Sequence, residues 1–544
     1  MKAIYKYLVL PIILGMGVFT TVSCEKLETT NEDPNNPVEV PSNMLMSGTQ
    51  KRMMDNVYDN WFGARQCLTY SQYWAQRNYT EEDRYQIRES VNNGYFNIFY
   101  RCLYCMDRLI ELNTDPTKAT ISAVYGNNKN QIAAAKIMKV WMLSIITDTW
   151  GNVPYTEAGK LTKDVYYAKY DSQKDIYAAM IKELTEASQM INVKEKAFTG
   201  GDIIYKGDAS KWKKFANSLR CRLAIHLSKV DSNWKTYIAE ALKDGVFESN
   251  ADNAVFKYST TGQEYCMFYS GYYVSGRNDF TITRPFMDIL KGQADTLNKK
   301  SHPWAGVVDP RLTVYTTPRI IQKKKGDVVI SSDTLYIGIP FGIPSGNNMF
   351  STFRNMAPNW YANPPIQLTQ DFTVPIMTYA ELQFILSEYK GFSADEYKEG
   401  VRASVTYWTT LNGKPISTAN LDAYVDAVSK KVDAEAVALQ KYIDLFMNGT
   451  EAWVEIRRTG YPDQLIRPGE ISAIDAEGKA LKFEPLSDTK GLIIPRVKYP
   501  TNESTLNGAN FNAAVSKLEG GTNNYYSKMY WDVRTGPYDH PANK

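Results

Sequence analysis

The pattern of apolar and polar positions in this chain predicts helices, and the most apolar of them lies between Ile132 and Ile146. That stretch carries only two charges, Lys136 and Lys139, which are three positions apart and therefore share one side of a helix. Apolar side chains occupy the rest of its circumference, and the run is too short to span a bilayer. We therefore expect this helix to be buried among other helices.

Further helices are indicated by apolar residues that recur at intervals of three and four. They are predicted over residues 43–62, 89–112, 169–191, 208–227, 234–242, 378–385 and 434–447. The spacing of Ser172 and Asp175, like that of Thr378 and Glu381, suits a capping box, and Asp208 suits an N-cap. Short turns between such helices predict stacked helical hairpins in which neighbours bury each other's apolar stripes.

The region from residue 250 to residue 370 has a different character. Gly, Pro and aromatic residues separate brief extended runs there, and two of these runs, Arg319–Gln322 and Val328–Ser331, flank a Lys-Gly-Asp turn that suits a hairpin. After Pro462 the pattern predicts irregular structure to the end of the chain. We expect an all-α dominated fold of stacked helix pairs, with a loop-rich insertion that carries short hairpins.

The N-terminus has the layout of an export signal. Lys2 and Lys6 precede an apolar run from Tyr7 to Phe19, and small or apolar residues then lead to Cys24, as in a bacterial lipobox. We expect cleavage before Cys24 and its acylation; the alternative is an ordinary signal peptide with an incidental cysteine. The acidic and proline-containing residues that follow predict a polar tether that need not fold.

Composition and cysteine spacing exclude several classes of function. The chain is 44% hydrophobic and 22% charged, which is ordinary for a soluble protein, and its net charge of +3 does not favour nucleic-acid binding. Cys102 and Cys105 form a CxxC motif, but both fall in the apolar stripe of the 89–112 helix. Because no second CxxC completes a metal site, we interpret them as reduced core cysteines.

An enzyme would need a reactive constellation, and the sequence offers little toward one. The chain has three histidines and no HExxH or triad signature. Two carboxylates would be enough for glycoside hydrolysis, and the acidic run Glu81–Asp83 lies near Trp74 and Tyr85. We expect those acids to be solvated, so a binding protein is favoured over an enzyme, and a purely structural lid stays as the third hypothesis. No cofactor and no metal site is expected.

Several sequence blocks, in the same order, resemble the SusD/RagB-type nutrient-binding outer-membrane lipoproteins of the Bacteroidetes. The blocks are TDTWGNVPYTEA (147–158), KYDSQKDIY (169–177), GDASKWKKFANSLRCRLA (207–224), DPRL (309–312), YIGIPFG (336–342), PIMTYAELQFILSE (375–388), NGTEAWVEIRRTGYP (448–462) and IPRVKYPTNE (494–503). In the seventh block, Arg457 and Arg458 are expected to pair with carboxylates or to cap carbonyls, with an anion site as the alternative.

The resemblance implies tetratricopeptide-like helix pairs, a lipid anchor in the outer membrane, and a protein that faces the cell exterior. It also implies capture of an oligosaccharide, or in some relatives a peptide, for a SusC-like TonB-dependent transporter. The expected organisation is a signal peptide at 1–23, a lipidated tether at 24–42 and a single domain at 43–544, which comprises a helical scaffold (43–249 and 371–462), the insertion (250–370) and an irregular C-terminal region (463–544).

No ligand residue follows from these blocks, so the candidate site is chosen from the residues themselves. Aromatic rings that stack on sugars, together with amides and charges that orient hydroxyls, occur in two predicted loops. The candidate residues are Tyr73, Trp74, Arg77, Asn78, Tyr79 and Asp83 in the first, and Tyr269, Tyr272, Tyr273, Arg277, Asn278 and Asp279 in the second. The identity of the ligand, whether glycan or peptide, stays open.

Overall fold

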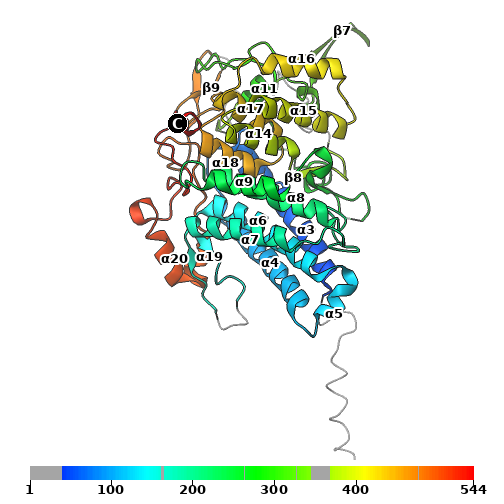
Figure 1. The fold of residues 1–544 in the computed structure, drawn as a ribbon. Helices are drawn as coiled ribbons and strands as arrows, with labels where there is room; N and C mark the ends of the chain where they lie inside the picture. The colour runs from blue at the N-terminus through cyan, green and yellow to red at the C-terminus, as the bar shows by residue number, and fades with distance from the viewer. Residues whose placement is uncertain are drawn as a thin grey trace, which may run out of the picture.

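The computed structural model describes residues 40–544 except 161–164, 263, 278, 326, 345–367 and 476. The predicted signal peptide, most of the tether and Cys24 therefore lie outside the described residues. The first half of the fold is a row of helices in which each contacts the next. They are α3 (Ser42–Val57), α4 (Glu89–Thr114), α6 (Asn128–Trp150), α7 (Gln173–Met190), α8 (Ala209–His226) and α9 (Trp234–Asp244), with the short α5 (Ala119–Ser122) at the lower end in Figure 1.

Helix α6 is buried, as its apolar sequence predicts. It contacts α4, α7 and α8 as well as α18 (Gly449–Thr459) from the second half of the chain. Its first turn is capped by Asn127, whose side chain accepts a hydrogen bond from Asn130 N at 3.0 Å. At its other end Gly151 has φ +85°, a conformation that a side chain would oppose.

The caps predicted from the sequence are confirmed. Ser172 accepts from Asp175 N at 3.2 Å, Asp208 from Lys211 N at 3.2 Å, and Thr378 from Glu381 N at 3.0 Å. Each side chain thus satisfies one of the amides that a helix start leaves without an intrahelical partner.

The second half of the chain returns to helices that lie above the first set in Figure 1. They are α14 (Tyr379–Tyr389), α15 (Ala394–Leu411), α16 (Thr418–Val428), α17 (Ala434–Asp444) and α18. The sequence pattern predicts α14 and α17, whereas α15 and α16 are additional. Helix α14 contacts both α8 and α15, so it joins the two halves of the stack. The described structure is rich in helices with few short strands, and the predicted fold class is confirmed.

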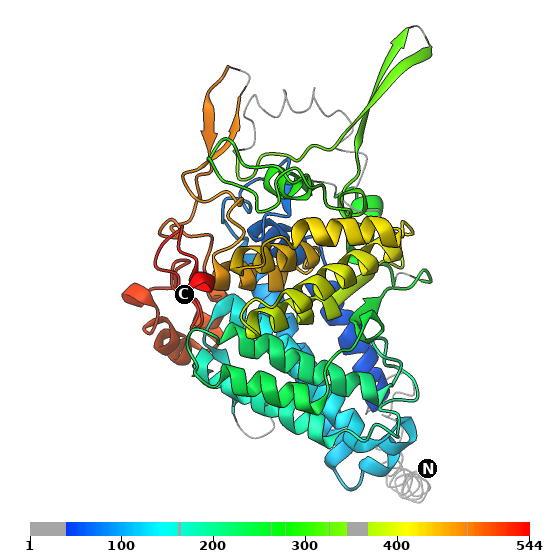
Figure 2. The same cartoon turned by 45° about the horizontal axis from the view of Figure 1, so that its top comes forward.

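The predicted insertion contributes to the core as well as to the surface. It holds α10 (Met267–Tyr269), the π-helical η5 (Ser270–Val274), α11 (Arg284–Leu290), α12 (Leu312–Tyr315) and the strands β4 (Ala254–Lys257), β5 (Phe280–Ile282), β6 (Arg319–Lys325) and β7 (Val328–Leu335). The predicted hairpin is confirmed as β6 paired with β7, which projects beyond the helices in Figure 2. Strand β4 pairs with β8 (Thr373–Met377), and both contribute buried side chains.

The region after Pro462 is more ordered than the sequence pattern predicts. It contains a hairpin of β9 (Ile471–Ile474) and β10 (Ala480–Lys482), followed by α19 (Thr501–Leu506) and α20 (Gly508–Val515). Its side chains also complete the core, because Trp531 is fully buried and donates to the Asp148 carboxylate of α6 at 2.8 Å. The expectation of an irregular region is therefore wrong for these elements.

The cysteines behave as the helical spacing predicts. Cys102 is buried in α4, and burial raises the pKa of its thiol to about 12. Cys105, one turn further on, is half-buried and packs against the same core, and both cysteines are free. Within the described residues no helix is both long and apolar enough to cross a membrane.

Candidate functional site

The two predicted ligand-binding segments lie side by side in the structure. The short strand β1 (Trp74–Gln76) pairs antiparallel with β5, so that Trp74 lies opposite Ile282 and Gln76 opposite Phe280. The pairing continues past the strand ends, because Arg77 N donates to the carbonyl of Asp279 at 2.6 Å. Segments that are far apart in sequence thus form one structural unit.

Three of the predicted rings belong to the core of this unit, and their assignment as ligand contacts is wrong. Trp74 is fully buried and stacks on Phe280 with ring centroids 4.8 Å apart. Tyr73 is fully buried against Tyr442, and its hydroxyl donates to the Tyr442 carbonyl. Tyr272 is buried as well. Pairing of β1 with β5 places Trp74 against Phe280, while Tyr73 packs on Tyr442 and Tyr272 lies edge-on to Phe280.

The predicted polar residues mostly brace the same unit. Arg77, Asp83 and Asp279 are buried, and Asn78 is half-buried. Asp83 accepts from Gln76 N at 2.7 Å, and burial raises the pKa of its carboxyl to about 7. Their assignment as surface ligand contacts is therefore wrong for the three buried residues. Asn278 lies outside the described residues.

The expectation that the acidic run 81–83 is solvated is wrong for two of its three residues. Glu82 is buried, accepts from the Gln76 side chain at 3.0 Å and pairs with Arg88 at 2.6 Å. Asp83 also turns inward, as described above, and only Glu81 is partly exposed. Glu82 and Asp83 thus fix the loop after β1 through hydrogen bonds to Gln76. Because both are buried, they are not placed to act on a substrate.

A row of partly exposed tyrosines lies on the other predicted segment. Tyr265, Tyr269 and Tyr273 are spaced by four residues, and neighbouring rings have centroids 5.9 and 5.0 Å apart. Tyr273 is 50% exposed, while Tyr265 and Tyr269 are half-buried. We call these three residues the tyrosine platform. Tyr269 and Tyr273 lie in helical structure (α10 and η5) rather than in the predicted loop, whereas Tyr265 lies just before α10 and was missed.

A tryptophan ringed by arginines lies close to this segment. The guanidinium carbons of Arg65, Arg88 and Arg277 lie 4.7, 5.1 and 6.0 Å from the centre of the half-buried Trp61 ring. Arg88 and Arg277 are exposed, whereas Arg65 is buried and pairs with Asp279 at 2.9 Å. We call these four residues the Trp61 cluster. Only Arg277 belongs to the residues predicted from sequence.

The platform and the cluster are linked through one close contact. Gly271 of η5 has no side chain and so leaves room for Asn60, the neighbour of Trp61. The Gly271 carbonyl also accepts a hydrogen bond from Arg277 N at 2.7 Å. A second π-helix, η1 (Phe62–Leu68), begins directly after Trp61. Single π-helical turns are frequent at functional sites. Aromatic faces can stack on a sugar ring, and neighbouring guanidinium groups can orient its hydroxyls. The predicted residue Tyr79 is 51% exposed and lies three residues beyond β1.

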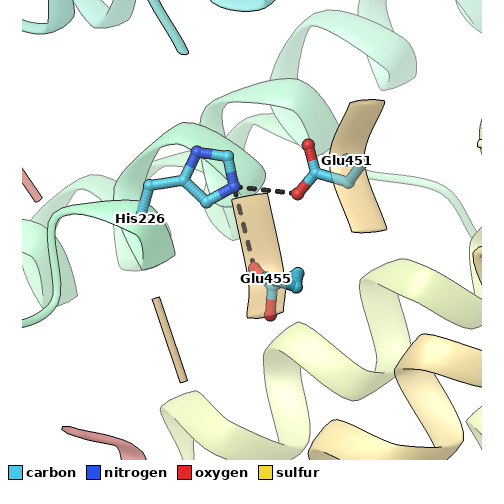
Figure 3. A group of neighbouring side chains, drawn as sticks. All are labelled: His226, Glu451 and Glu455. Carbon is cyan, nitrogen blue, oxygen red and sulfur yellow. Dashed lines mark hydrogen bonds and ion pairs between the residues drawn. The ribbon is translucent and has the colours of Figure 1, made fainter. Parts of the chain in front are cut away.

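A second cluster of interest lies inside the helical stack. His226 Nε2 lies 2.8 Å from Glu451 Oε1 and 3.8 Å from Glu455 Oε1, with all three side chains buried (Figure 3). The other ring nitrogen, Nδ1, lies 3.0 Å from the Tyr177 hydroxyl. One imidazole and two carboxylates are ligands that a metal ion accepts.

The surrounding cations make this cluster an ion-pair network instead of a metal centre. Glu455 pairs with Lys441 at 3.1 Å and with Arg458 at 2.8 Å, and Glu451 lies 3.6 Å from Arg222. Burial alone would raise the pKa of Glu451, but its cationic neighbours outweigh burial and hold the pKa at about 2. A dication there would have to displace these cations. The ion pairs instead join α8 to α17 and α18.

The arginine pair of the seventh sequence block is structural, as predicted. Arg458 makes a bidentate pair with Glu388, with both N–O distances 2.7 Å. Arg457 donates to the carbonyls of Asp148 and Pro495 at 2.8 Å each. Both guanidinium groups are buried, so the alternative of an anion site is not favoured.

Comparison with known proteins identifies the same architecture. The family SusD-like_2, described as "Starch-binding associating with outer membrane", matches residues 34–479. No curated protein sequence matches this chain. A solved structure named as a chitin-binding protein is 27% identical, with a TM-score of 0.70 over 91% of this chain and 100% of that one.

Two further solved structures share the fold at lower identity. A SusD homolog from Parabacteroides distasonis is 20% identical, with a TM-score of 0.68 over 92% of this chain and 100% of that one. A chitin-binding SusD homolog from Flavobacterium johnsoniae is 20% identical, with a TM-score of 0.64 over 90% and 99%. With a family match over most of its length and these structures beside it, the chain belongs to the SusD-like family.

Proposed function

We propose that this protein is a cell-surface lipoprotein that binds an oligosaccharide at the tyrosine platform and passes it to a TonB-dependent transporter. The observation that carries the proposal is the row of Tyr265, Tyr269 and Tyr273, whose rings stay partly exposed while most neighbouring rings are buried. The family description names starch binding, and two similar structures are named as chitin-binding proteins, which supports a carbohydrate as the ligand.

Binding at this place needs stacking and orientation but no catalytic group. An apolar sugar face would lie against one or two tyrosine rings, and hydroxyls would exchange hydrogen bonds with exposed guanidinium groups such as Arg277. Among the described acids near this segment, Glu264 next to Tyr265 lies 3.3 Å from Lys51, and Asp279 and Glu82 pair with arginines. Such groups can position a ligand, and we therefore propose a binding protein and not an enzyme.

Delivery to a membrane transporter requires that the protein stay at the surface. We propose that acylation of Cys24 anchors it in the outer membrane, with the tether up to residue 42 linking the anchor to α3. Several acyl chains on one cysteine would hold the protein firmly, whereas one chain alone gives marginal, reversible binding. A SusC-like partner remains part of this proposal.

A direct test is a binding screen with the mature protein. Neutral malto- and chito-oligosaccharides would be compared with peptides of similar size by calorimetry, and each sugar would be analysed for cleavage after prolonged incubation. We expect binding of at least one sugar series without cleavage. Binding of peptides alone would support the peptide-binding alternative, and release of shorter sugars would support the hydrolase alternative; either result would contradict the proposal.

A further inference from the structure

A cavity of about 850 Å³ lies away from the tyrosine platform, among helices of the first half of the chain. Its walls come from α4, α6 and α7, which are neighbours in the stack (Figure 1), and from the loop that leaves α6. Its size falls within the range of ligand-binding pockets, about 300–1,000 Å³. None of the lining residues belongs to the tyrosine platform or to the Trp61 cluster.

The only two charges on the apolar part of α6 lie at this cavity. Lys136 and Lys139 both line it, and their side chains are each 19% exposed. Lys136 pairs with Glu186 of α7 at 3.1 Å, and Lys139 pairs with Asp107 of α4. The two ammonium groups are therefore held at the cavity wall by carboxylates from the helices on either side.

Tyrosines and one glycine form part of the cavity wall. Tyr104 of α4 is 48% exposed at the cavity, and the Tyr155 hydroxyl lies 3.2 Å from Glu183 of α7. Gly159 has φ +71°, and a Cβ there would lie 3.2 Å from the Asp107 carboxylate. A residue without a side chain thus lets the loop backbone approach the cavity.

The charge arrangement indicates what kind of ligand fits. Among the described residues, five cationic side chains (Arg108, Lys136, Lys139, Lys160 and Lys182) and four anionic ones (Asp107, Glu111, Glu183 and Glu186) line the cavity, a formal excess of one positive charge within that set. Several of these charges already pair with one another, so a charged ligand would have to compete with existing ion pairs. A neutral polyol would not, because each ammonium has three donors and each carboxylate about four acceptor positions.

We propose that this cavity is a second carbohydrate site, which takes a short neutral oligosaccharide. Tyr104 supplies a ring face for stacking, and the paired lysines and carboxylates bind hydroxyls with the donors and acceptors that their ion pairs leave over. The site is independent of the tyrosine platform. Two sites on one chain would allow a longer glycan to be held at two points, which raises avidity without new contacts at either site.

Hydrogen exchange of the full mature protein tests this without any variant. Neutral malto- and chito-oligosaccharides, from trisaccharide to hexasaccharide, would each be added at millimolar concentration. We expect slower exchange in the loop segment 154–160, separately from any change in segment 265–277. Unchanged exchange at 154–160 with every sugar would overturn the second site, whereas unchanged exchange at 265–277 alone would count only against the platform.

A variant pair then assigns the effect to the cavity. Tyr104→Ala should weaken binding at this site about tenfold, as expected for loss of one stacking ring. Tyr166→Ala is the matched control, because Tyr166 is 65% exposed and does not line the cavity. Both would be made in a Tyr265→Ala/Tyr269→Ala/Tyr273→Ala background, which removes all three rings of the tyrosine platform. Equal affinities of the Tyr104 and Tyr166 variants would overturn the proposal.

Discussion

Gly271 lies so close to Asn60 that a Cβ at position 271 would sit 1.5 Å from Asn60 Nδ2. This contact links the helical segment of the tyrosine platform to the residue before Trp61. We expect Gly271→Ala to force the two segments apart and to lower the free energy of unfolding by about 1–3 kcal/mol, the usual effect of overpacking. Urea denaturation measures this directly.

Two further variants show whether that one contact is responsible. Asn60→Ala combined with Gly271→Ala should recover most of the lost stability, because the clashing amide is gone. Gly94→Ala in α4 is the control, since a Cβ there meets nothing within 4 Å and Ala is preferred to Gly in a helix. A Gly271→Ala variant as stable as the parent would show that Asn60 moves aside freely.

Burial of Trp74 leads to a second prediction. Trp74→Ala should lower the free energy of unfolding by about 3–5 kcal/mol, because it removes a fully buried ring stacked on Phe280. Tyr79→Ala, at a half-exposed ring three residues beyond β1, should change stability by less than about 0.5 kcal/mol. Similar melting temperatures for Trp74→Ala and the parent would contradict the burial.

The contrast between Trp74 and the platform shows what sequence reasoning could and could not provide. The aromatic and polar composition of both segments was visible in the sequence, and the structure places those segments together. The pairing of β1 with β5, which places Trp74 inside against Phe280, joins distant parts of the chain and has no local signal. Neither Tyr265, which lies before α10, nor Trp61, whose ring is approached by Arg88 and Arg277 from other segments, has a local signal.

The helices were more accessible because their signals are local. The apolar run of α6 predicts its burial, and Ser172, Asp208 and Thr378 cap their helices as expected. Arg222 shows the limit, since it is buried in an ion pair with Glu381 on α14, a partner that no periodicity reveals. The helices after Ser393 and after Ser417 were missed, as were the short elements beyond Pro462.

The network around His226 predicts a pH dependence of stability. The pKa of Glu451 is about 2 in the folded protein against an ordinary value of 4.5, so its ionised form stabilises the fold. That contribution is complete above about pH 4.5 and is lost as the pH falls toward 2. Glu451→Gln should therefore cost about 3–5 kcal/mol near neutrality, because it leaves buried cations uncompensated, and less in acid.

Chemical denaturation across a pH series tests this difference. The gap in unfolding free energy between the parent and Glu451→Gln should narrow from about pH 5 to pH 2. Glu248→Gln serves as the control, because Glu248 is exposed and its pair with Lys214 lies at the surface. A gap that stays constant with pH would contradict the ion-pair assignment.

The proposed lipid anchor at Cys24, a residue outside the described part of the chain, leads to a further prediction. Cys24→Ala should yield unprocessed or released protein, because the residue that would carry the lipid is gone. Fractionation of cells into membrane and soluble material, with the mass of the N-terminal peptide, measures both outcomes. Membrane retention of correctly cleaved Cys24→Ala protein at the parent level would contradict acylation at this cysteine.

The measurement that tests the central claim most directly is calorimetric titration of a Tyr269→Ala/Tyr273→Ala variant with the best-bound oligosaccharide. The control is Tyr166→Ala/Tyr167→Ala, which removes two tyrosines that are 65% and 67% exposed elsewhere on the surface. We predict that the platform variant loses about tenfold or more in affinity at its stronger site while the control binds as the parent does. Equal affinities for the two variants would contradict binding at the tyrosine platform.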